Sequence, residues 1–334
     1  MRVSIVIPAY NAASTIGQTV QWSLEQANNG CELEVIVVDD GSTDDTAIVA
    51  AAHGARVISQ VNQGPAAARN RGWHEATGSI VCFTDADCIP CKNWLANLLQ
   101  GFRDWRVGAV AGSYHIANAG SWLARWVHRE IIERHNRMPA TVRAFGSYNV
   151  AMPRYILAAT GGFNTEYPQA SGEDTDLSYR IIKGGWHIVF VPEARVAHYH
   201  PENLWRYLKE QFRHGYWRAK LYTDHPEMIA GDDYTLLKDR VEPLFVLATT
   251  GLFLLFGSGF AVLQMPLWLT LVCYAFLQLI WPLKWGIAER KLAPLPYAGV
   301  TFVRGFVRTG GLALGALRFG KKFLVPTWFK ANRL

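Results

Sequence analysis

The stretch LEVIVVDDGSTDDT, residues 33–46, joins an uninterrupted apolar run to an acidic turn. The residues of LEVIVV are typical of a strand that is buried on both faces. Asp39 and Asp40 follow at once, so their carboxylates stand at the carboxyl end of that strand. The glycine, serine and threonine after them indicate a turn that leads into a helix. The stretch therefore predicts one strand–turn–helix unit of a parallel α/β sheet.

The same unit repeats outward along the chain in both directions. We expect strands at Val3–Pro8, Leu33–Val38, Arg56–Ser59 and Ser79–Thr84, and helices at Ser14–Gln26, Ala47–His53 and Ala66–Ala76. This alternation predicts a mostly parallel sheet with helices on both faces. Ligands of such sheets bind beyond the carboxyl ends of the strands.

A second pair of carboxylates ends the fourth expected strand. In CFTDADC, residues 82–88, Asp85 and Asp87 stand one residue apart, and we expect them on the same edge of the sheet as Asp39. A D-x-D at a strand end offers oxygen ligands to a hard divalent cation such as Mg²⁺ or Mn²⁺. Such a metal neutralises a diphosphate as it leaves. A solvated acidic turn is the alternative interpretation.

Composition limits the class of protein. The chain has 334 residues and a net charge of +6. Half of its residues are apolar, and this apolar content excludes a disordered protein. Basic residues gather toward the C-terminal end beside apolar runs, which favours an anionic membrane surface over nucleic acid. The five cysteines are scattered, which argues for a reducing compartment, and the isolated C-x-x-C of Cys88 and Cys91 is interpreted as structural. The N-terminus enters a strand without a signal-peptide core, so we expect the N-terminal part to stay in the cytoplasm.

Two long uncharged runs lie in the last third of the chain. Residues 244–263 and 266–283 are each about long enough to cross the hydrocarbon core of a membrane. Lys and Arg flank this pair and are missing from the turn within it, which predicts a hairpin with both ends in the cytoplasm. Two buried helices of a soluble domain are the alternative.

Amphipathic segments flank the two apolar runs. Residues 203–222 interleave aromatic residues with Lys and Arg, as in a helix that lies on a membrane surface or one that packs on the globular domain. Residues 297–320 are apolar but are interrupted by Arg304, Arg308 and several glycines, which predicts an interfacial or partly inserted segment, with a third span as the alternative. The cations of residues 318–333 suit acidic lipid head groups. We therefore expect a globular domain at 1–202, a helical linker at 203–240 and a membrane region at 241–334.

Six motifs occur in a fixed order along the first two-thirds of the chain. They are SIVIPAYN (4–11), VIVVDDGSTDDT (35–46), NQGPAAARNRG (62–72), FTDADC (83–88), GGFNTEY (161–167) and SGEDTDLSYRI (171–181). The ordered set resembles the family 2 glycosyltransferases of the GT-A fold, of the membrane-attached bacterial type, over residues 3–201. The resemblance implies a Rossmann-like, mostly parallel sheet and a nucleotide-sugar donor, with UDP as the default nucleotide. It also implies Mg²⁺ or Mn²⁺ and transfer with inversion at the sugar carbon.

The resemblance and the strand-end positions together imply a donor site at this edge of the sheet. Asp39 and Asp40 are expected to accept hydrogen bonds from a base imide and a ribose hydroxyl, or else to form an Asx turn that caps the next helix. The backbone at Pro8 to Tyr10 would flank the same base. Arg69 offers a planar cation to the diphosphate or the base, while Asn70 after it is expected to cap a helix turn.

The resemblance assigns Asp87 to the metal and Asp85 to the ribose or a metal-bound water. ARVAHYHP, residues 194–201, follows a strand expected at 187–192 and adds His198 and His200. Alternation on an extended segment aims both histidines to one side, and in relatives a histidine here completes the metal shell. We prefer His198 as the ligand; His200 in its place, or neither histidine, are the alternatives.

Direct displacement at an anomeric carbon needs a base on the face opposite the leaving group. By resemblance Asp174, in GEDTDL, is that base, and Glu173 positions the acceptor or supports Asp174. Asp176 and Arg180 lie a helical turn apart and are expected to form an ion pair. The side chains expected to converge on one pocket are Asp39, Asp87, Asp174 and His198.

These features predict a metal-dependent inverting glycosyltransferase at the cytoplasmic face of the inner or plasma membrane of a bacterium. QFRHGYW, residues 211–217, departs from the Q-x-x-R-W element of processive members, so transfer of one or a few sugars is expected. The membrane region favours a lipid-linked acceptor, such as a glycolipid or a polyprenyl-linked glycan, with a saccharide acceptor as the alternative. Membrane lipids are further expected partners, and nucleic acid is not.

Two other classes of protein share some of these features. A catalytically silent nucleotide-sugar-binding scaffold would keep the sheet and use the hairpin to recruit partners. A nucleotidyltransferase would need a lysine- and glycine-rich loop after the first strand, where this chain has PAYNAAST.

Overall fold

The structure, a computed structural model, describes residues 1–26 and 30–320 and divides into two compact units. The first comprises residues 1–200 together with 232–234, and the second comprises residues 201–231 and the chain from 235 onward. Residues 232–234 join the first unit through hydrogen bonds such as that from Arg134 to the Tyr234 carbonyl oxygen (3.0 Å). Most of the basic tail, from residue 321 on, lies outside the described residues.

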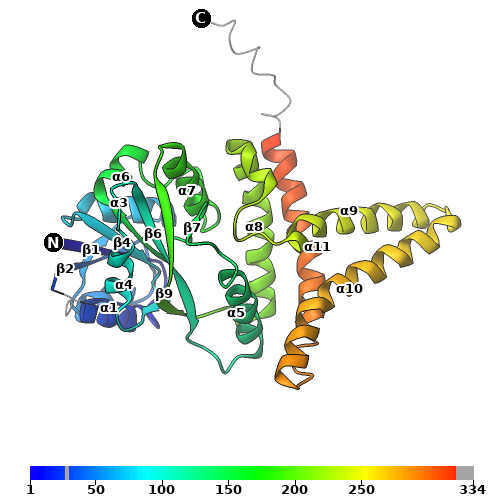
Figure 1. Ribbon diagram of the computed structural model, residues 1–334, viewed down its shortest axis with the longest axis horizontal. Coiled ribbons are helices and arrows are strands. Elements are labelled where there is room, and N and C mark those ends of the chain that lie inside the picture. The colour runs from blue at the N-terminus through cyan, green and yellow to red at the C-terminus, as the bar shows by residue number, and fades with distance from the viewer. Residues whose placement is uncertain (27–29, 321–334) are drawn as a thin grey trace, which may run out of the picture. The chain divides into compact units, whose positions relative to one another are not determined.

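The first unit is an α/β domain built on one nine-stranded sheet (Figure 1). Its strands are β1 (Arg2–Ala9), β2 (Glu32–Asp39), β3 (Arg56–Ser59), β4 (Ile80–Thr84), β5 (Cys88–Pro90), β6 (Val107–Ile116), β7 (Thr141–Val142), β8 (Asn149–Pro153) and β9 (His187–His198). Its helices are α1 (Ile16–Leu24), α2 (Thr46–Ala52), α3 (Pro65–Glu75), α4 (Trp94–Gln100), α5 (Trp122–His135), α6 (Arg154–Thr160) and α7 (Glu173–Lys183). The strand order is β3-β2-β1-β4-β8-β6-β9-β5, and β7 pairs with β9.

Strands β1 to β4 form a parallel half-sheet, and the predicted strands and helices of this region are confirmed. Successive side chains of a strand point to opposite faces, so Val6 packs in one hydrophobic cluster, while Ile5 and Ile7 pack in another. Trp73 of α3 belongs to the first cluster, and Ile16 of α1 belongs to the second. Helices therefore cover both faces of the half-sheet, as the unbroken apolar strands require.

The other half of the sheet is mixed. β8 lies antiparallel between β4 and β6, β6 runs parallel to β9, and β5 pairs antiparallel with the end of β9. The pairing of β5 with β9 sets Cys88 opposite His198. This register brings the end of the D-x-D segment, in the first third of the chain, beside a histidine that follows more than a hundred residues later.

The second unit consists of helices. They are α8 (Leu204–Asp224), the 3₁₀ turn η2 (Pro226–Ala230), α9 (Leu237–Gly257), the 3₁₀ turn η3 (Ala261–Leu263), α10 (Gln264–Glu289) and α11 (Tyr297–Phe319). Within the described chain, α9 and α10 are long and apolar enough to cross a membrane, by length and composition. Only 17% and 28% of their apolar windows are buried, which distinguishes them from the core helices of a soluble domain.

Helices α8 and α11 of this unit lie side by side (Figure 1). The contact is close because glycines meet backbone: a Cβ added at Gly215 would collide with the Arg308 carbonyl oxygen, and one at Gly311 with that of Phe212. Arg304 is buried here and donates to the Tyr207 hydroxyl (3.0 Å). The segment expected to be interfacial is thus one continuous helix, α11, and it is not among the candidate spans.

Candidate active site

The carboxyl ends of β1 and β2 form one side of the candidate site. Their parallel register sets Ala9 beside Asp39, whose Oδ1 accepts a hydrogen bond from the Ser42 N–H (3.2 Å). Asn11 continues β1 in a left-handed conformation (φ 49°) and its Oδ1 accepts from the Thr43 N–H (2.8 Å). The two strand ends are therefore joined by side-chain bonds. Pro8, near the end of β1, is half-buried, and Tyr10, just after the strand, is exposed.

Asp40 is buried and holds the loop before α3 through hydrogen bonds. Its Oδ1 accepts hydrogen bonds from the Gln60 side chain (2.8 Å) and the Gln63 N–H (2.9 Å), and its Oδ2 accepts from the Gly64 N–H (2.8 Å). Gly64 has a positive φ of 89°, and a Cβ there would collide with the Pro168 carbonyl oxygen. The sequence indicated a carboxylate at this edge but not its partners, because the loop closes through pairing of β2 with β3.

Arg69 of α3 connects two parts of the site. Its guanidinium is buried and donates to Asp85 Oδ1 (2.8 Å) and to Glu173 Oε1 (2.9 Å). It also lies 5.5 Å from the centre of the Phe163 ring, a cation–π distance. Burial alone lowers the pKa of Arg69, but the Asp85 and Glu173 carboxylates outweigh it and raise the pKa above its ordinary value. The side chain is a fixed cation between the D-x-D and the start of α7.

Asp87 and His198 meet at the junction of β5 and β9. His198 Nε2 lies 3.7 Å from Asp87 Oδ1, and Cys88 Sγ is close enough for the three side chains to surround one ion. Burial raises the pKa of the Cys88 thiol well above its ordinary value, so it stays protonated. A carboxylate oxygen with an imidazole nitrogen fits Mn²⁺ or Mg²⁺, whereas a neutral thiol does not. Asp87 and His198 are therefore the two suitable donors of the cluster.

The charged form of the Asp87 carboxylate is destabilised in its surroundings, mainly by burial. Burial raises the pKa of Asp87; His198 partly opposes this shift and Asp85 adds to it. A bound divalent cation would reverse the balance, because it stabilises both carboxylates in their charged form.

His200 faces away from Asp87. Its Nδ1 lies 3.1 Å from His198 Nδ1, and its Nε2 lies 3.1 Å from Nδ1 of His128 on α5. The ring is almost fully buried, at 3% exposure. Of the two histidines in ARVAHYHP, His198 is thus the one with a ring nitrogen beside Asp87. No local sequence pattern indicates that His128 belongs to this group.

Glu173 and Asp174 form the first turn of α7, where the positive end of the helix dipole favours carboxylates. Asp174 Oδ1 accepts from the Thr175 N–H (2.7 Å) and Oδ2 from the Ser147 N–H (3.4 Å). Burial nevertheless raises the pKa of Asp174. Burial and the neighbouring Asp174 raise the pKa of Glu173 to about 7, with Arg69 opposing them. Two adjacent carboxyl groups whose pKa values are both raised can hold or accept a proton.

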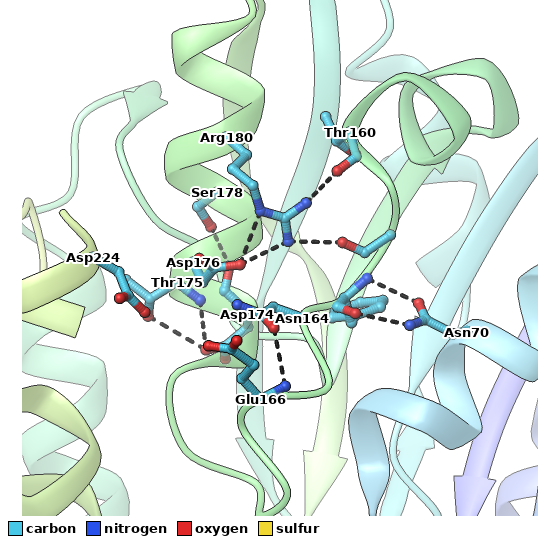
Figure 2. Close-up of polar contacts among 12 residues, drawn as sticks. Asn70, Thr160, Asn164, Glu166, Asp174, Thr175, Asp176, Ser178, Arg180 and Asp224 are labelled. Carbon is cyan, nitrogen blue, oxygen red and sulfur yellow. Dashed lines mark hydrogen bonds and ion pairs between the residues drawn. The ribbon is translucent and has the colours of Figure 1, made fainter. Parts of the chain in front are cut away.

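The predicted ion pair between Asp176 and Arg180 is confirmed, and Figure 2 shows it. Arg180 donates from Nε (2.9 Å) and Nη2 (2.7 Å) to Asp176 Oδ2. The same guanidinium donates to the carbonyl oxygens of Thr160 and Gly162. The pair therefore also fastens α7 to the turn after α6.

The prediction that Asn70 caps a helix turn is wrong. Its amide donates to the Phe163 carbonyl oxygen (2.7 Å) and accepts from the Phe163 N–H (2.8 Å). The Trp73 indole N–H also donates to Asn70 Oδ1 (3.1 Å). Asn70 thus joins α3 to the GGF turn, a contact that local sequence patterns do not reveal.

Comparisons with known proteins agree with this arrangement. Residues 4–159 match the family described as "Glycosyl transferase family 2". A probable glycosyltransferase of Bacillus subtilis is 29% identical over 254 residues, which are 71% of this chain and 56% of the relative. A pre-mycofactocin glycosyltransferase of Mycobacterium tuberculosis is 33% identical over 241 residues, 68% of this chain and 49% of the relative. The chain therefore spans about half the length of these curated relatives.

A solved structure shares the fold over nearly the whole chain. It is a mannosyltransferase from Pyrobaculum calidifontis in complex with GDP-Man and Mn²⁺, with a TM-score of 0.59 and 21% identity. The likeness covers 95% of this chain and 87% of that one. The expected α/β fold of GT-A type is thereby confirmed for the first unit, although its sheet is mixed and not mostly parallel as expected.

Proposed function

Since the chain belongs, through residues 4–159, to glycosyl transferase family 2, we propose that it is a metal-dependent inverting glycosyltransferase. The observation that carries the proposal is the Arg69 bridge, which joins Asp85 of the D-x-D to Glu173, next to Asp174. One buried cation thus ties the residues proposed for the donor diphosphate to those proposed for the acceptor.

The donor site is proposed at the ends of β1, β2 and β4. Asp39 is the residue for the base or ribose, with Pro8 and Tyr10 flanking the base. Asp40 contributes by holding the adjoining loop, because both of its oxygens already accept hydrogen bonds within the protein. Asp85 is assigned to the ribose or a metal-bound water, and Arg69 balances its charge. A UDP-sugar is the first donor to test, and a GDP-sugar the second.

Asp87 and His198 would hold the divalent cation, Mn²⁺ or Mg²⁺. The cation supplies positive charge that stabilises the diphosphate as it leaves. His198 presents Nε2 toward Asp87 Oδ1 at 3.7 Å, so one cation bound between them would take a ligand atom from each.

Asp174 is proposed to take the proton from the attacking acceptor hydroxyl. The Thr175 and Ser147 N–H groups hold its carboxylate in one orientation, and its raised pKa strengthens it as a base at neutral pH. Glu173, bound to Arg69 and to the Ser171 N–H (2.8 Å), supports the start of α7. A single displacement inverts the anomeric carbon and needs no covalent intermediate on the protein.

A lipid-linked acceptor at the cytoplasmic face of a membrane is the second part of the proposal. On α8, Trp205 and Phe212 are exposed among Arg206 and Lys209, a composition suited to a membrane surface. A cavity of about 800 Å³ within the second unit is lined by apolar side chains of α8 and α11 and by four charged residues of α8. These are the cations Arg206, Lys209 and Arg213 and the carboxylate Glu210, which pairs with Arg206 (3.2 Å). That volume accommodates part of a prenyl or acyl chain, with a phosphate at the basic rim.

The test is release of nucleoside diphosphate by the full-length protein in detergent. UDP- and GDP-sugars are supplied with a membrane-lipid extract, and Mn²⁺ or Mg²⁺ is compared with EDTA. We expect metal-dependent release from one donor, lost in Asp174→Asn and kept in the control Asp104→Asn, whose carboxylate is exposed.

Two outcomes would contradict the proposal. A protein that binds a nucleotide sugar but releases no diphosphate with any acceptor extract is a silent scaffold. Release of pyrophosphate instead of a nucleoside diphosphate would identify a nucleotidyltransferase.

A further inference from the structure

The proposed mechanism leaves two neighbouring histidines, the buried His200 and the half-buried His128, without a role. His200 is 3% exposed and both of its ring nitrogens are engaged, with His198 Nδ1 and His128 Nδ1, each at 3.1 Å. The order of contacts is therefore Asp87, His198, His200, His128. These groups come from three segments of the first unit: the D-x-D turn, the end of β9 and helix α5.

The two nitrogen–nitrogen contacts restrict where the protons lie. A contact of 3.1 Å between ring nitrogens is a hydrogen bond with one proton, so one ring donates and the other accepts. His198 can offer Nε2 to a cation only when its proton is on Nδ1. That proton is then donated to His200 Nδ1, and His200 carries its own proton on Nε2, where it is donated to His128 Nδ1.

We propose that His200 and His128 are positioning residues that select the Nδ1–H tautomer of His198 and aim its Nε2 lone pair at a divalent cation held with Asp87. The inference rests on the proposed function, because it concerns the same metal site. Partners of this kind commonly fix the tautomer and the ring orientation of metal-binding histidines. Here a second histidine takes the place of the carboxylate or carbonyl that usually accepts the proton.

Contacts within the protein hold His198 and His200 in place without a metal. The Asn118 side chain accepts from the His200 N–H (3.1 Å) and donates to the His200 carbonyl oxygen (2.8 Å). Tyr114 lies edge-on to the His200 ring, with centroids 5.6 Å apart. His198 is held in the sheet, opposite Cys88 of β5. A change of the His200 side chain can therefore remove its nitrogens without releasing the main chain.

The experiment compares variants that differ in hydrogen bonding at one position. His200→Phe keeps a ring against Tyr114 and loses both nitrogens, whereas His200→Asn keeps an oxygen that can accept the proton of His198 Nδ1. His128→Phe removes only the outer partner. His115→Phe is the matched control, because His115 is an exposed histidine of the same cluster, 6.5 Å from His128 between ring centroids.

The readout is Mn²⁺ affinity of the full-length protein in detergent with saturating UDP, measured from the electron paramagnetic resonance signal of free Mn²⁺. We expect His200→Phe to weaken binding by about 10- to 100-fold, His128→Phe to weaken it less, and His200→Asn and His115→Phe to stay near wild type. Melting temperatures in EDTA identify any variant that has failed to fold.

A second measurement reports the tautomer directly. In protein labelled with ¹⁵N-histidine and saturated with Mg²⁺ and UDP, the ring shifts of His198 should indicate a proton on Nδ1, and His200→Phe should lose this preference. If His200→Phe binds Mn²⁺ with wild-type affinity while Asp87→Asn loses binding, the inference about His200 is overturned and the proposed metal site stands. If the wild-type protein itself binds no Mn²⁺, the proposed metal site fails and the inference falls with it.

Discussion

The site residues at the parallel half of the sheet bond to residues close in the sequence, whereas those toward the mixed half bond to residues far away in the sequence. In the parallel half, Asp39 bonds to Ser42, and Asp40 bonds to the segment 60–64. Toward the mixed half the contacts are long-range: Arg69 of α3, a helix on the parallel half, reaches Glu173, which is 104 residues away, and Asp87 meets His198 of β9. The donor side thus depends on local turns, whereas the metal and base side depends on closure of the whole domain.

The largest effect on activity is expected from removing the proposed base, Asp174. Asp174→Asn removes the base and leaves a side-chain oxygen for only one of the two backbone N–H donors, those of Thr175 and Ser147. The rate of nucleoside-diphosphate release should fall by about 10²- to 10⁴-fold, the usual contribution of a general base. Calorimetry of UDP binding should give an unchanged Kd, because the parallel half is intact. A variant with normal turnover would move the base to another residue.

Arg69→Met tests how strongly the two halves depend on one another. It leaves Glu173 buried without its cation, and breaking a buried pair in this way costs about 3–5 kcal/mol of folding free energy. Denaturant unfolding of the full-length protein in detergent gives the loss.

The control for Arg69→Met is on the same helix. Arg71 is exposed and pairs with Glu75 at 3.1 Å, and Arg71→Met should cost less than about 1 kcal/mol. Equal losses for the two variants would mean that the Arg69 bridge does not hold the domain together. Adding Glu173→Gln to Arg69→Met should recover part of the loss, since the unpaired charge is then removed.

Asp40→Asn is expected to have a smaller, local effect in the parallel half. One of the three donors now facing Asp40 would meet an amide N–H instead of an oxygen, at a cost of about 1–3 kcal/mol. Because the loop before α3 borders the proposed donor site, affinity for UDP should fall while Mn²⁺ binding at Asp87 persists. Loss of both ligands together would show that the two halves are not separable.

The pH dependence should be the mildest effect. Glu173 and Asp174 both have raised pKa values, Glu173 to about 7, so kcat/KM should fall as pH drops through values above those of ordinary carboxyl groups. Glu173→Gln removes a negative charge beside Asp174, which lowers the pKa of Asp174 and should move this acid limb to lower pH. An acid limb that stays in place in Glu173→Gln would mean that another group titrates.

Features that depend on short spacing could be predicted from the sequence. LEVIVVDD predicts both a buried strand and the carboxylates at its end, and the four-residue spacing of Asp176 and Arg180 predicts their ion pair. The two apolar helices also follow from length and composition. In each case one segment contains all the information that the prediction needs.

Features set by pairing between distant segments could not be predicted. The antiparallel insertion of β8, the contact of Asn70 with Phe163 and the approach of His128 to His200 all depend on sheet register and helix packing. The sequence indicates that Arg69 is a cation near the donor site, but its carboxylate partners Asp85 and Glu173 depend on where α3 and α7 lie in the fold. Local propensity carries no information on such distances.

The GGF turn described above has a mechanical consequence. Asn70 on α3 holds the backbone of Phe163, and Arg180 on α7 holds the carbonyl oxygen of Gly162. The two helices are thus clamped to adjacent residues of one turn, and a displacement of either is transmitted to the other within a few bonds. An engineer who exchanges acceptor specificity between relatives should therefore transplant residues 64–75 and 160–183 together. A chimera that takes these two segments from different parents would lose the matched contacts of Asn70 with Phe163 and of Arg180 with Gly162.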